Sequence, residues 1–236
     1  MSDMQSPLIC RVTALDLALQ RRPWPFADQR RAEIDTHFAE QQRLNPNLWN
    51  GRVLLGRDPV FAGERLSASY FETDFASFLA WRDWGFPDKE VFNGFGMGAL
   101  LSSDGAFVCG VMGERTANAG RIYFPSGTPD LDDIRGETVD IAGSVMRELE
   151  EETGLKPSDC RGDADWHCIY TGVALAMMRI LRVDMPADAL RTKIESNLAR
   201  QENPELVGIH LVRSRADLTA AMPRFVTAFI ETQLSE

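Results

Sequence analysis

The chain has few features of secreted, membrane-spanning or nucleic-acid-binding proteins. Its 236 residues include four cysteines with no CxxC spacing, so neither a disulfide framework nor a cysteine metal site is expected (Cys10, Cys109, Cys160 and Cys168). No apolar run approaches the about 18 residues of a membrane span, and the amino terminus lacks the basic start and apolar run of a signal peptide. A net charge of −10 argues against nucleic acid or an anionic membrane as the main partner. We therefore expect a soluble, cytoplasmic protein.

The sequence does contain a regular succession of strand-like and helix-like segments. Apolar residues make up 44% of the chain, which is enough for a sizeable core. We predict an α/β or α+β fold, a mixed sheet flanked by helices, with an αβ extension over residues 1–90 and a second domain over residues 91–236. The predicted strand regions are 8–19, 51–74, 94–112, 120–127, 168–185 and 206–214, and the predicted helices are 28–44, 74–86, 141–153, 187–201 and 222–234.

The helix predicted over residues 141–153 has a clear beginning, end and buried side. Asp140 is a suitable N-cap, and Gly154 is a suitable residue to end the helix in a left-handed conformation. Val145 and Leu149 lie four residues apart and are expected to face the core. The polar segment before this helix shows little periodicity and is predicted to be a loop.

The stretch "RELEEETGL" over residues 147–155 is unusually acidic for a helix. Glu148, Glu151 and Glu152 project from one face, where like charges repel by roughly 0.2–0.5 kcal/mol per pair. Either water solvates this face, or a cation neutralises it. Three converging carboxylates suit a hard, oxygen-preferring ion, so we expect Mg²⁺ or Mn²⁺ if the second alternative holds.

The order of residues in this stretch resembles the second half of the Nudix box, REUxEExGU, in which U is aliphatic. Arg147 opens the match and Gly154 and Leu155 close it, with agreement at every defined position. The resemblance covers roughly residues 95–215 and implies the Nudix α/β/α sandwich and hydrolysis of a nucleoside diphosphate linked to another moiety. It also implies metal ligands, namely Glu148, Glu151, Glu152 and the carbonyl group of Gly127.

The region before the helix departs from the family pattern, Gly-x5-Glu-x7-Arg. Asp133 and Val139 stand where the pattern has glycine and glutamate. If Gly127 serves as the glycine, the loop is six residues longer than usual. Glu137 is then a candidate partner for Arg147, and the alternative is that this loop leaves Arg147 without one.

Further charged residues are candidates for catalysis and phosphate binding. The resemblance implies an extra acid before a late strand, so Glu205 is our first choice for the general base and Glu202 our second; a polar turn around Pro204 is the alternative. Arg115 and Arg121 could steady phosphate groups, or they could be solvated loop residues.

The amino-terminal segment bears on the substrate. Its layout is similar to that of the Nudix UDP-glucose pyrophosphatases, which implies a nucleotide sugar cleaved to a nucleoside monophosphate and a sugar phosphate. Trp49 and Phe71 could stack on the base, or could simply pack in the core. The histidines, His37, His167 and His210, have no partner spacing, and His210 is taken as a strand residue.

Several alternatives remain open at this stage. The same metal site would serve an ADP-ribose, dinucleotide or coenzyme A pyrophosphatase, a non-catalytic ligand sensor would bind without turnover, and an acidic scaffold would bind no metal. A homodimer is also open, although no interface patch stands out.

Overall fold

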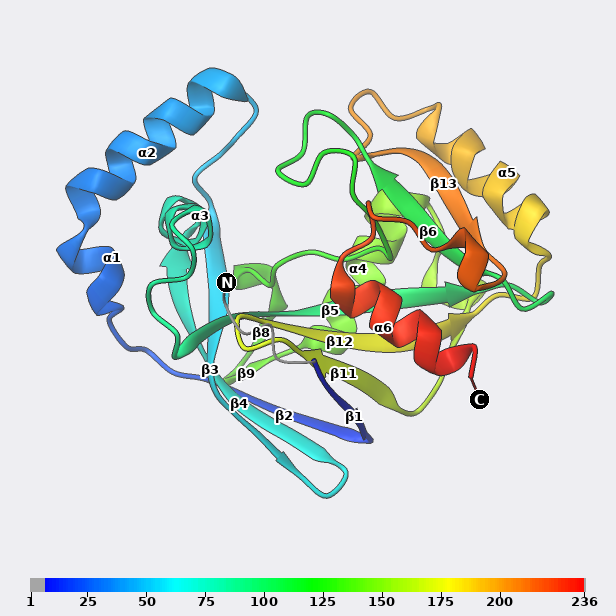
Figure 1. The fold of residues 1–236 in the computed structure, drawn as a ribbon, viewed down its shortest axis with the longest axis horizontal. Coiled ribbons are helices and arrows are strands. Elements are labelled where there is room, and N and C mark those ends of the chain that lie inside the picture. Colours follow the sequence, from blue (N-terminus) through cyan, green and yellow to red (C-terminus); the bar gives the residue numbers. More distant parts are fainter. Residues whose placement is uncertain (1–6, 236) are drawn as a thin grey trace.

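The computed structural model describes residues 7–235, and their strands join in one mixed sheet (Figure 1). The strands are β1 (Leu8–Val12), β2 (Ala14–Leu19), β3 (Arg52–Ala62), β4 (Arg65–Asp74), β5 (Val91–Leu101), β6 (Phe107–Met112), β7 (Ile122–Tyr123), β8 (Ile134–Arg135), β9 (Thr138–Val139), β10 (Arg161–Gly162), β11 (Trp166–Tyr170), β12 (Ala174–Arg182) and β13 (Leu206–Val212). The helices are α1 (Pro25–Gln29), α2 (Arg31–Leu44), α3 (Phe75–Asp83), α4 (Ile141–Thr153), α5 (Ala187–Leu198) and α6 (Arg224–Gln233). The predicted α/β class, a mixed sheet with flanking helices, is confirmed.

Strand β5 is the point at which the parts of the sheet meet. It runs parallel to β12 along its length, pairs antiparallel with β3 near its beginning, and pairs antiparallel with β6 at its end. Asn93, in register with Ala174 of β12, therefore lies close to the fork between β3 and β12. Residues near this fork form part of the cavity described below.

Helices α4 and α6 cover opposite faces of β5 (Figure 1). The ring of Phe95 lies 5.5 Å from that of Phe225 on α6. A Cβ on Gly96, the next residue, would collide with Val145 and Ile141 of α4. Because successive strand residues point to opposite faces, the sheet separates the two helices. Because Gly96 has no side chain, α4 can approach β5 closely. This close approach fixes the position of the acidic turn of α4.

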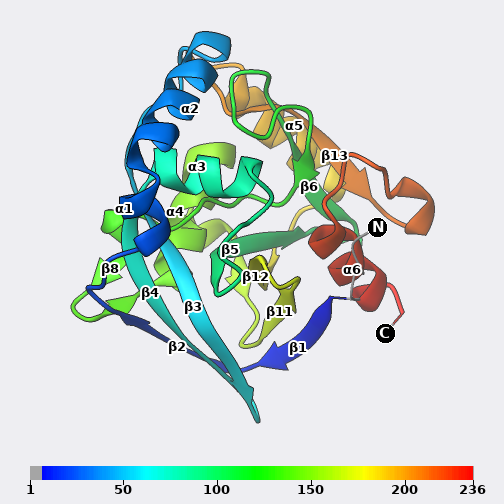
Figure 2. The same cartoon turned by 60° about the vertical axis from the view of Figure 1, so that its left-hand side comes forward.

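Helix α3 covers the amino-terminal strands β3 and β4, with α2 outside it (Figure 2). Its first turn is capped by Asp74, whose carboxylate accepts a 2.9 Å hydrogen bond from the Ser77 amide. The same carboxylate accepts a 2.8 Å bond from Arg31, which ties α2 to α3. Trp81 of α3 is fully buried among aromatic side chains. These contacts fix α3 against β3, β4 and α2.

Two local predictions about the sheet were wrong. Residues 8–19 form two strands rather than one, because the chain bends at Thr13 and moves from β11 to β4 as its partner. The segment between Thr128 and Asp140 is not a plain loop, since β8 and β9 pair within it and β9 also pairs with β2.

The domain boundary near residue 90 stays a prediction. Strands on either side of it pair with one another, since β1 joins β11 and β3 joins β5. None of the helices within residues 7–235 is both long enough and apolar enough to cross a membrane.

Candidate metal centre and adjoining cavity

Helix α4 presents its glutamates to the turn around Gly127. As predicted, Asp140 caps the helix by accepting a 2.9 Å bond from the Gly143 amide, and Gly154 ends it with φ of 72°. Val145 and Leu149 are fully buried, as expected. A Cβ on Gly127 would lie 2.3 Å from Oε1 of Glu148, so any larger residue here would displace this carboxylate.

Glu152 is a buried carboxylate without a hydrogen-bond partner. The residue is 4% exposed, and neither side-chain oxygen has a partner of acceptable geometry. Burial raises the pKa of Glu152 well above its usual value, and the charges of Glu148 and Glu205 raise it further, while the Ser126 amide partly opposes this. An unpartnered buried carboxylate is costly, so a cation at this position would relieve a real destabilisation.

Glu148 and Glu205 share this environment. Burial raises the pKa of Glu148 to about 7, although Arg147 opposes the shift, and Glu151 and Glu205 add to it. Burial and the charge of Glu151 also raise the pKa of Glu205. The glutamates therefore repel one another across a small space, as expected of side chains that hold a positive ion when it is bound.

Arg147 pairs with Asp133, so both alternatives given for it, a pairing with Glu137 and the lack of any partner, are wrong. Its Nη2 lies 3.0 Å from both carboxylate oxygens of Asp133, which is 2% exposed. Although burial opposes it, bonding to Asp133 raises the pKa of Arg147. Glu137 instead lies on the surface, in the turn between β8 and β9. The lengthened loop thus supplies its partner fourteen residues before the arginine, at the position where the family pattern has glycine.

The acidic side chains do not surround an ion as they stand. Within residues 7–235, no three histidine, cysteine or acidic side chains converge closely enough to enclose a metal. Nη1 of Arg147 lies 3.0 Å from Glu148 and 3.6 Å from Glu151, and so engages two of the predicted ligands. The donors still fit Mg²⁺ or Mn²⁺, because they are carboxylate oxygens and two of them, on Glu152, are buried without a partner.

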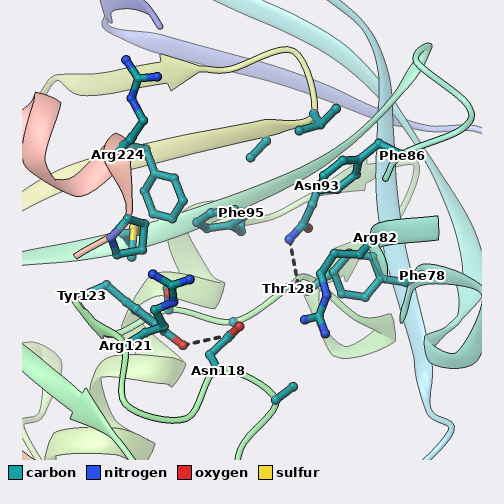
Figure 3. Close-up of a pocket in the computed structure, with 18 of the residues that line it drawn as sticks. Phe78, Arg82, Phe86, Asn93, Phe95, Asn118, Arg121, Tyr123, Thr128 and Arg224 are labelled. Atoms are coloured by element: carbon teal, nitrogen blue, oxygen red, sulfur yellow. Dashed lines mark hydrogen bonds between the residues drawn. The ribbon is translucent and has the colours of Figure 1, made fainter. Parts of the chain in front are cut away.

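A cavity of about 660 Å³ opens beside this cluster. Figure 3 shows most of the side chains that line it. The segment from Ser126 to Thr128 lines the cavity and also borders the acidic cluster, since Gly127 touches Glu148 and Ser126 lies near Glu152. The cavity wall contains three arginines and no aspartate or glutamate, in a chain whose net charge is −10. Its aromatic lining comes from both halves of the chain, namely Phe75, Phe78, Trp81, Phe86, Phe95, Tyr123 and Phe225. This combination favours a ligand with both an anionic and a planar apolar part.

Comparisons with known proteins give distant structural likenesses. Neither models of protein families nor curated proteins match the sequence. Among solved structures, the chain is similar to a Nudix hydrolase from M. smegmatis, RenU, at 12% identity and a TM-score of 0.38, over 60% of this chain and 84% of that one. It is also similar to the MutT protein from Methanosarcina mazei Go1, at 16% identity and a TM-score of 0.38, over 61% of this chain and 96% of that one. At this distance the likeness does not establish the family.

The structure separates the remaining candidate residues. Arg121 lines the cavity, whereas Arg115 lies outside its lining and donates to the side chain of Asn203. The charge of Glu205 acts on Glu148 and Glu152, whereas Glu202 contributes to none of these shifts, although both residues are exposed.

The two aromatic residues proposed for base stacking do not line the cavity. Phe71 is 1% exposed and packs in the core beside Trp24, and Trp49 is 81% exposed. For Phe71 the alternative of core packing is therefore confirmed, and neither residue could stack on a base in this cavity. Its aromatic side chains come from α3, the turn after it, β5, β7 and the start of α6. The aromatic residues of the cavity are spaced in the sequence like ordinary core residues, so only the folded structure identifies them as cavity residues. His210 is a strand residue, as expected, and its ring contacts the Asp217 carbonyl at 2.8 Å.

Proposed function

We propose that this protein hydrolyses the pyrophosphate bond of a nucleoside diphosphate linked to another moiety, with Mg²⁺ or Mn²⁺ as cofactor. One observation carries the proposal. The partnerless carboxylate of Glu152 and the raised pKa of Glu148 meet an arginine-bearing, aromatic cavity at the Gly127 turn.

The candidate ligands are Glu148, Glu151, Glu152 and the carbonyl of Gly127. A bound divalent ion would offset phosphate charge and lower the pKa of a coordinated water. Arg147 holds the acidic turn in place through Asp133, and so acts as a positioning residue.

Other residues are candidates for proton transfer and for binding the part of the substrate that lies away from the metal. Glu205 is the preferred general base, because its pKa is raised and its charge acts on the cluster; Glu202 is the second candidate. On the cavity side, Arg82 and Arg121 offer guanidinium groups to phosphate oxygens from different walls (Figure 3).

A nucleotide sugar such as UDP-glucose is the preferred substrate, cleaved to a nucleoside monophosphate and a sugar phosphate. This choice rests on the layout of the amino-terminal segment, whose helix α3 forms one cavity wall. ADP-ribose, a dinucleotide or coenzyme A would place the same groups in the same cavity. A non-catalytic ligand sensor is the second candidate, because Arg147 engages Glu148 and Glu151 in this structure.

The test is incubation of the full-length protein with Mg²⁺ and a panel of these compounds, followed by chromatography of the products. We expect a nucleoside monophosphate to form from at least one compound, and Glu151→Gln to lower turnover by about 10²-fold or more. Glu150→Gln is the matched control, since Glu150 lies beside it on α4 and is exposed. Binding without turnover would favour the sensor. The absence of both binding and turnover would refute the proposal.

A further inference from the structure

Two of the four cysteines oppose each other at the edge of the sheet. Cys10 of β1 and Cys168 of β11 are register partners in an antiparallel strand pair, although they lie far apart in the sequence (Figure 1). Directly opposed residues of an antiparallel pair point to the same face of the sheet. All four cysteines carry free thiols in this structure. The fold thus brings together two thiols whose sequence spacing gives no sign of a pair.

The backbone separation of this pair suits a disulfide bond. Opposed Cα atoms in antiparallel strands lie about 4.5 or 5.5 Å apart, depending on whether the pair is hydrogen-bonded. Both values fall within the about 4.4–6.8 Å between the Cα atoms of a disulfide. Opposed Cβ atoms lie about 4.5–5.5 Å apart, whereas a disulfide holds them at about 3.5–4.5 Å. The two strands therefore need to approach each other by only about 1 Å.

Strand β1 can make this small adjustment. It lies at the end of the sheet, and among the described strands only β11 pairs with it. Its first two residues are exposed although both are apolar, Leu8 at 48% and Ile9 at 42%. An edge strand of this kind can move toward its one neighbour without breaking the pairing of another strand.

The two thiols differ in burial, which sets the order in which they react. Cys10 is half-buried near the exposed beginning of β1, whereas Cys168 is fully buried. Burial raises the pKa of Cys168 to about 12, and the nearby Cys10 contributes to the shift, which agrees with two sulfur atoms that lie close together. A thiol must be ionised to attack a disulfide, so Cys10 is the residue that reacts first.

We propose that Cys10 and Cys168 form a reversible disulfide, which fastens β1 to β11 when the protein meets a low-molecular-weight disulfide such as oxidised glutathione. The thiolate of Cys10 attacks one sulfur of that compound, forms a mixed disulfide and releases one thiol. Cys168 then loses its proton and attacks the sulfur of Cys10, which releases the second thiol. Two protein thiols are oxidised, the small disulfide is reduced to two thiols, and these carry away the two cysteine protons.

The other two cysteines are not placed for such a bond. Cys109 of β6 has His210 of β13 as its register partner, and burial raises its pKa strongly. Cys160 lies outside the strands and donates a 3.8 Å hydrogen bond to the Pro157 carbonyl. We therefore expect one specific bond, between Cys10 and Cys168, and no mixture of pairings.

The experiment incubates the folded full-length protein with oxidised glutathione, blocks the remaining thiols by alkylation, and maps peptides by mass spectrometry without reductant. We expect a linked peptide pair that contains Cys10 and Cys168, which excess dithiothreitol separates again. Because the bond closes a long loop, the melting temperature of the oxidised protein should rise by about 4–16 °C. A lasting glutathione adduct on Cys10 without the linked pair, or no reaction at Cys10, would overturn the proposal.

Two serine variants provide a matched comparison. Cys10→Ser should abolish the linked peptide pair and the rise in melting temperature. Cys160→Ser is the control, because Cys160 is also half-buried but lies outside the pair, and it should retain both. A rise in melting temperature that persists in Cys10→Ser, or one that is lost in Cys160→Ser, would refute the assignment. Neither variant alters the fully buried Cys168, so the test needs no substitution in the core.

This inference goes beyond the proposed function and does not depend on it. Met177 of β12 is the register partner of Cys168, and Gly96 of β5, against which α4 packs, is the partner of Met177. The cysteine pair is thus separated from the acidic helix by two strands. Disulfide formation is measured without metal or nucleotide, so its failure and the failure of hydrolysis are distinguishable. A fastened β1 is less free to pair with another chain, which would protect the protein under oxidising conditions.

Discussion

The ion pair between Asp133 and Arg147 can be broken with little change in side-chain shape, by Asp133→Asn. The carboxylate accepts two 3.0 Å bonds from Arg147, one of 3.1 Å from the Ser144 hydroxyl and one of 3.1 Å from the Asp130 amide. Removing one partner of a buried ion pair typically costs about 3–5 kcal/mol. Asparagine keeps one acceptor oxygen, and the Arg147 side chain, which is 30% exposed, reaches water. Both effects lower the expected loss in free energy of unfolding to about 2–3 kcal/mol.

This loss should be visible in thermal unfolding of the metal-free protein. For a chain of this length, about 1 kcal/mol shifts the melting temperature by about 2–4 °C, so Asp133→Asn should lower it by about 4–12 °C. Turnover should also fall, because Arg147, released from Asp133, can engage Glu148 and Glu151 more closely. Urea titration provides an independent free energy of unfolding.

Two matched variants make the reasoning refutable. Asp132→Asn changes the same charge on the exposed neighbouring residue and should leave the melting temperature within about 2 °C of wild type. Glu137→Gln tests the partner suggested by the sequence pattern and should also be nearly neutral. A neutral Asp133→Asn, or a loss of equal size from Glu137→Gln, would show that the loop anchors Arg147 differently.

Three further predictions concern the acidic cluster and the cavity. Gly127→Ala should lower turnover by about 10²-fold, because its Cβ would displace Glu148; steady-state kinetics with unchanged melting behaviour would confirm a local effect. The pKa of Glu148 is raised to about 7, so the folded metal-free protein holds a proton there that the unfolded chain has lost. The free energy of unfolding should therefore fall by about 3 kcal/mol as pH rises from about 4.5 to 7. Glu152 should add a further loss above that range. Urea titrations at a series of pH values measure this, and a stability that rises over the same range would contradict it. Arg121→Gln should weaken nucleotide binding about tenfold while Arg115→Gln leaves it unchanged, as measured by titration; equal effects would exclude a special role for the cavity arginine.

The sequence was most informative where local chemistry decides the structure. Asp140 and Gly154 predicted both ends of α4, and Val145 and Leu149 predicted its buried face, because caps and helical periodicity act within a few residues. Glu152 was assigned to the acidic face, yet its burial without a partner could not be foreseen, since burial depends on how the folded chain packs around α4.

The cavity and the partner of Arg147 were beyond the reach of pattern reasoning. Asp133 was noticed only as a departure from a family pattern, and its pairing depends on the folded path of the lengthened loop. Phe78, Phe86 and Asn93 have ordinary strand or helix surroundings in the sequence. Their function as cavity walls comes from the way β5 joins the two parts of the sheet, which is a long-range property.

The pairing of β1 with β11 has a consequence for how the protein is made. Leu8 pairs with Tyr170, so β1 has no partner until 170 − 8 = 162 further residues have been synthesised. At translation rates of about 5–20 residues per second, that delay is on the order of ten to thirty seconds. During this time a strand with unpaired backbone groups is open to other nascent chains. Translation that stops before residue 166 should therefore yield aggregation-prone fragments that depend on chaperones, rather than a smaller folded protein.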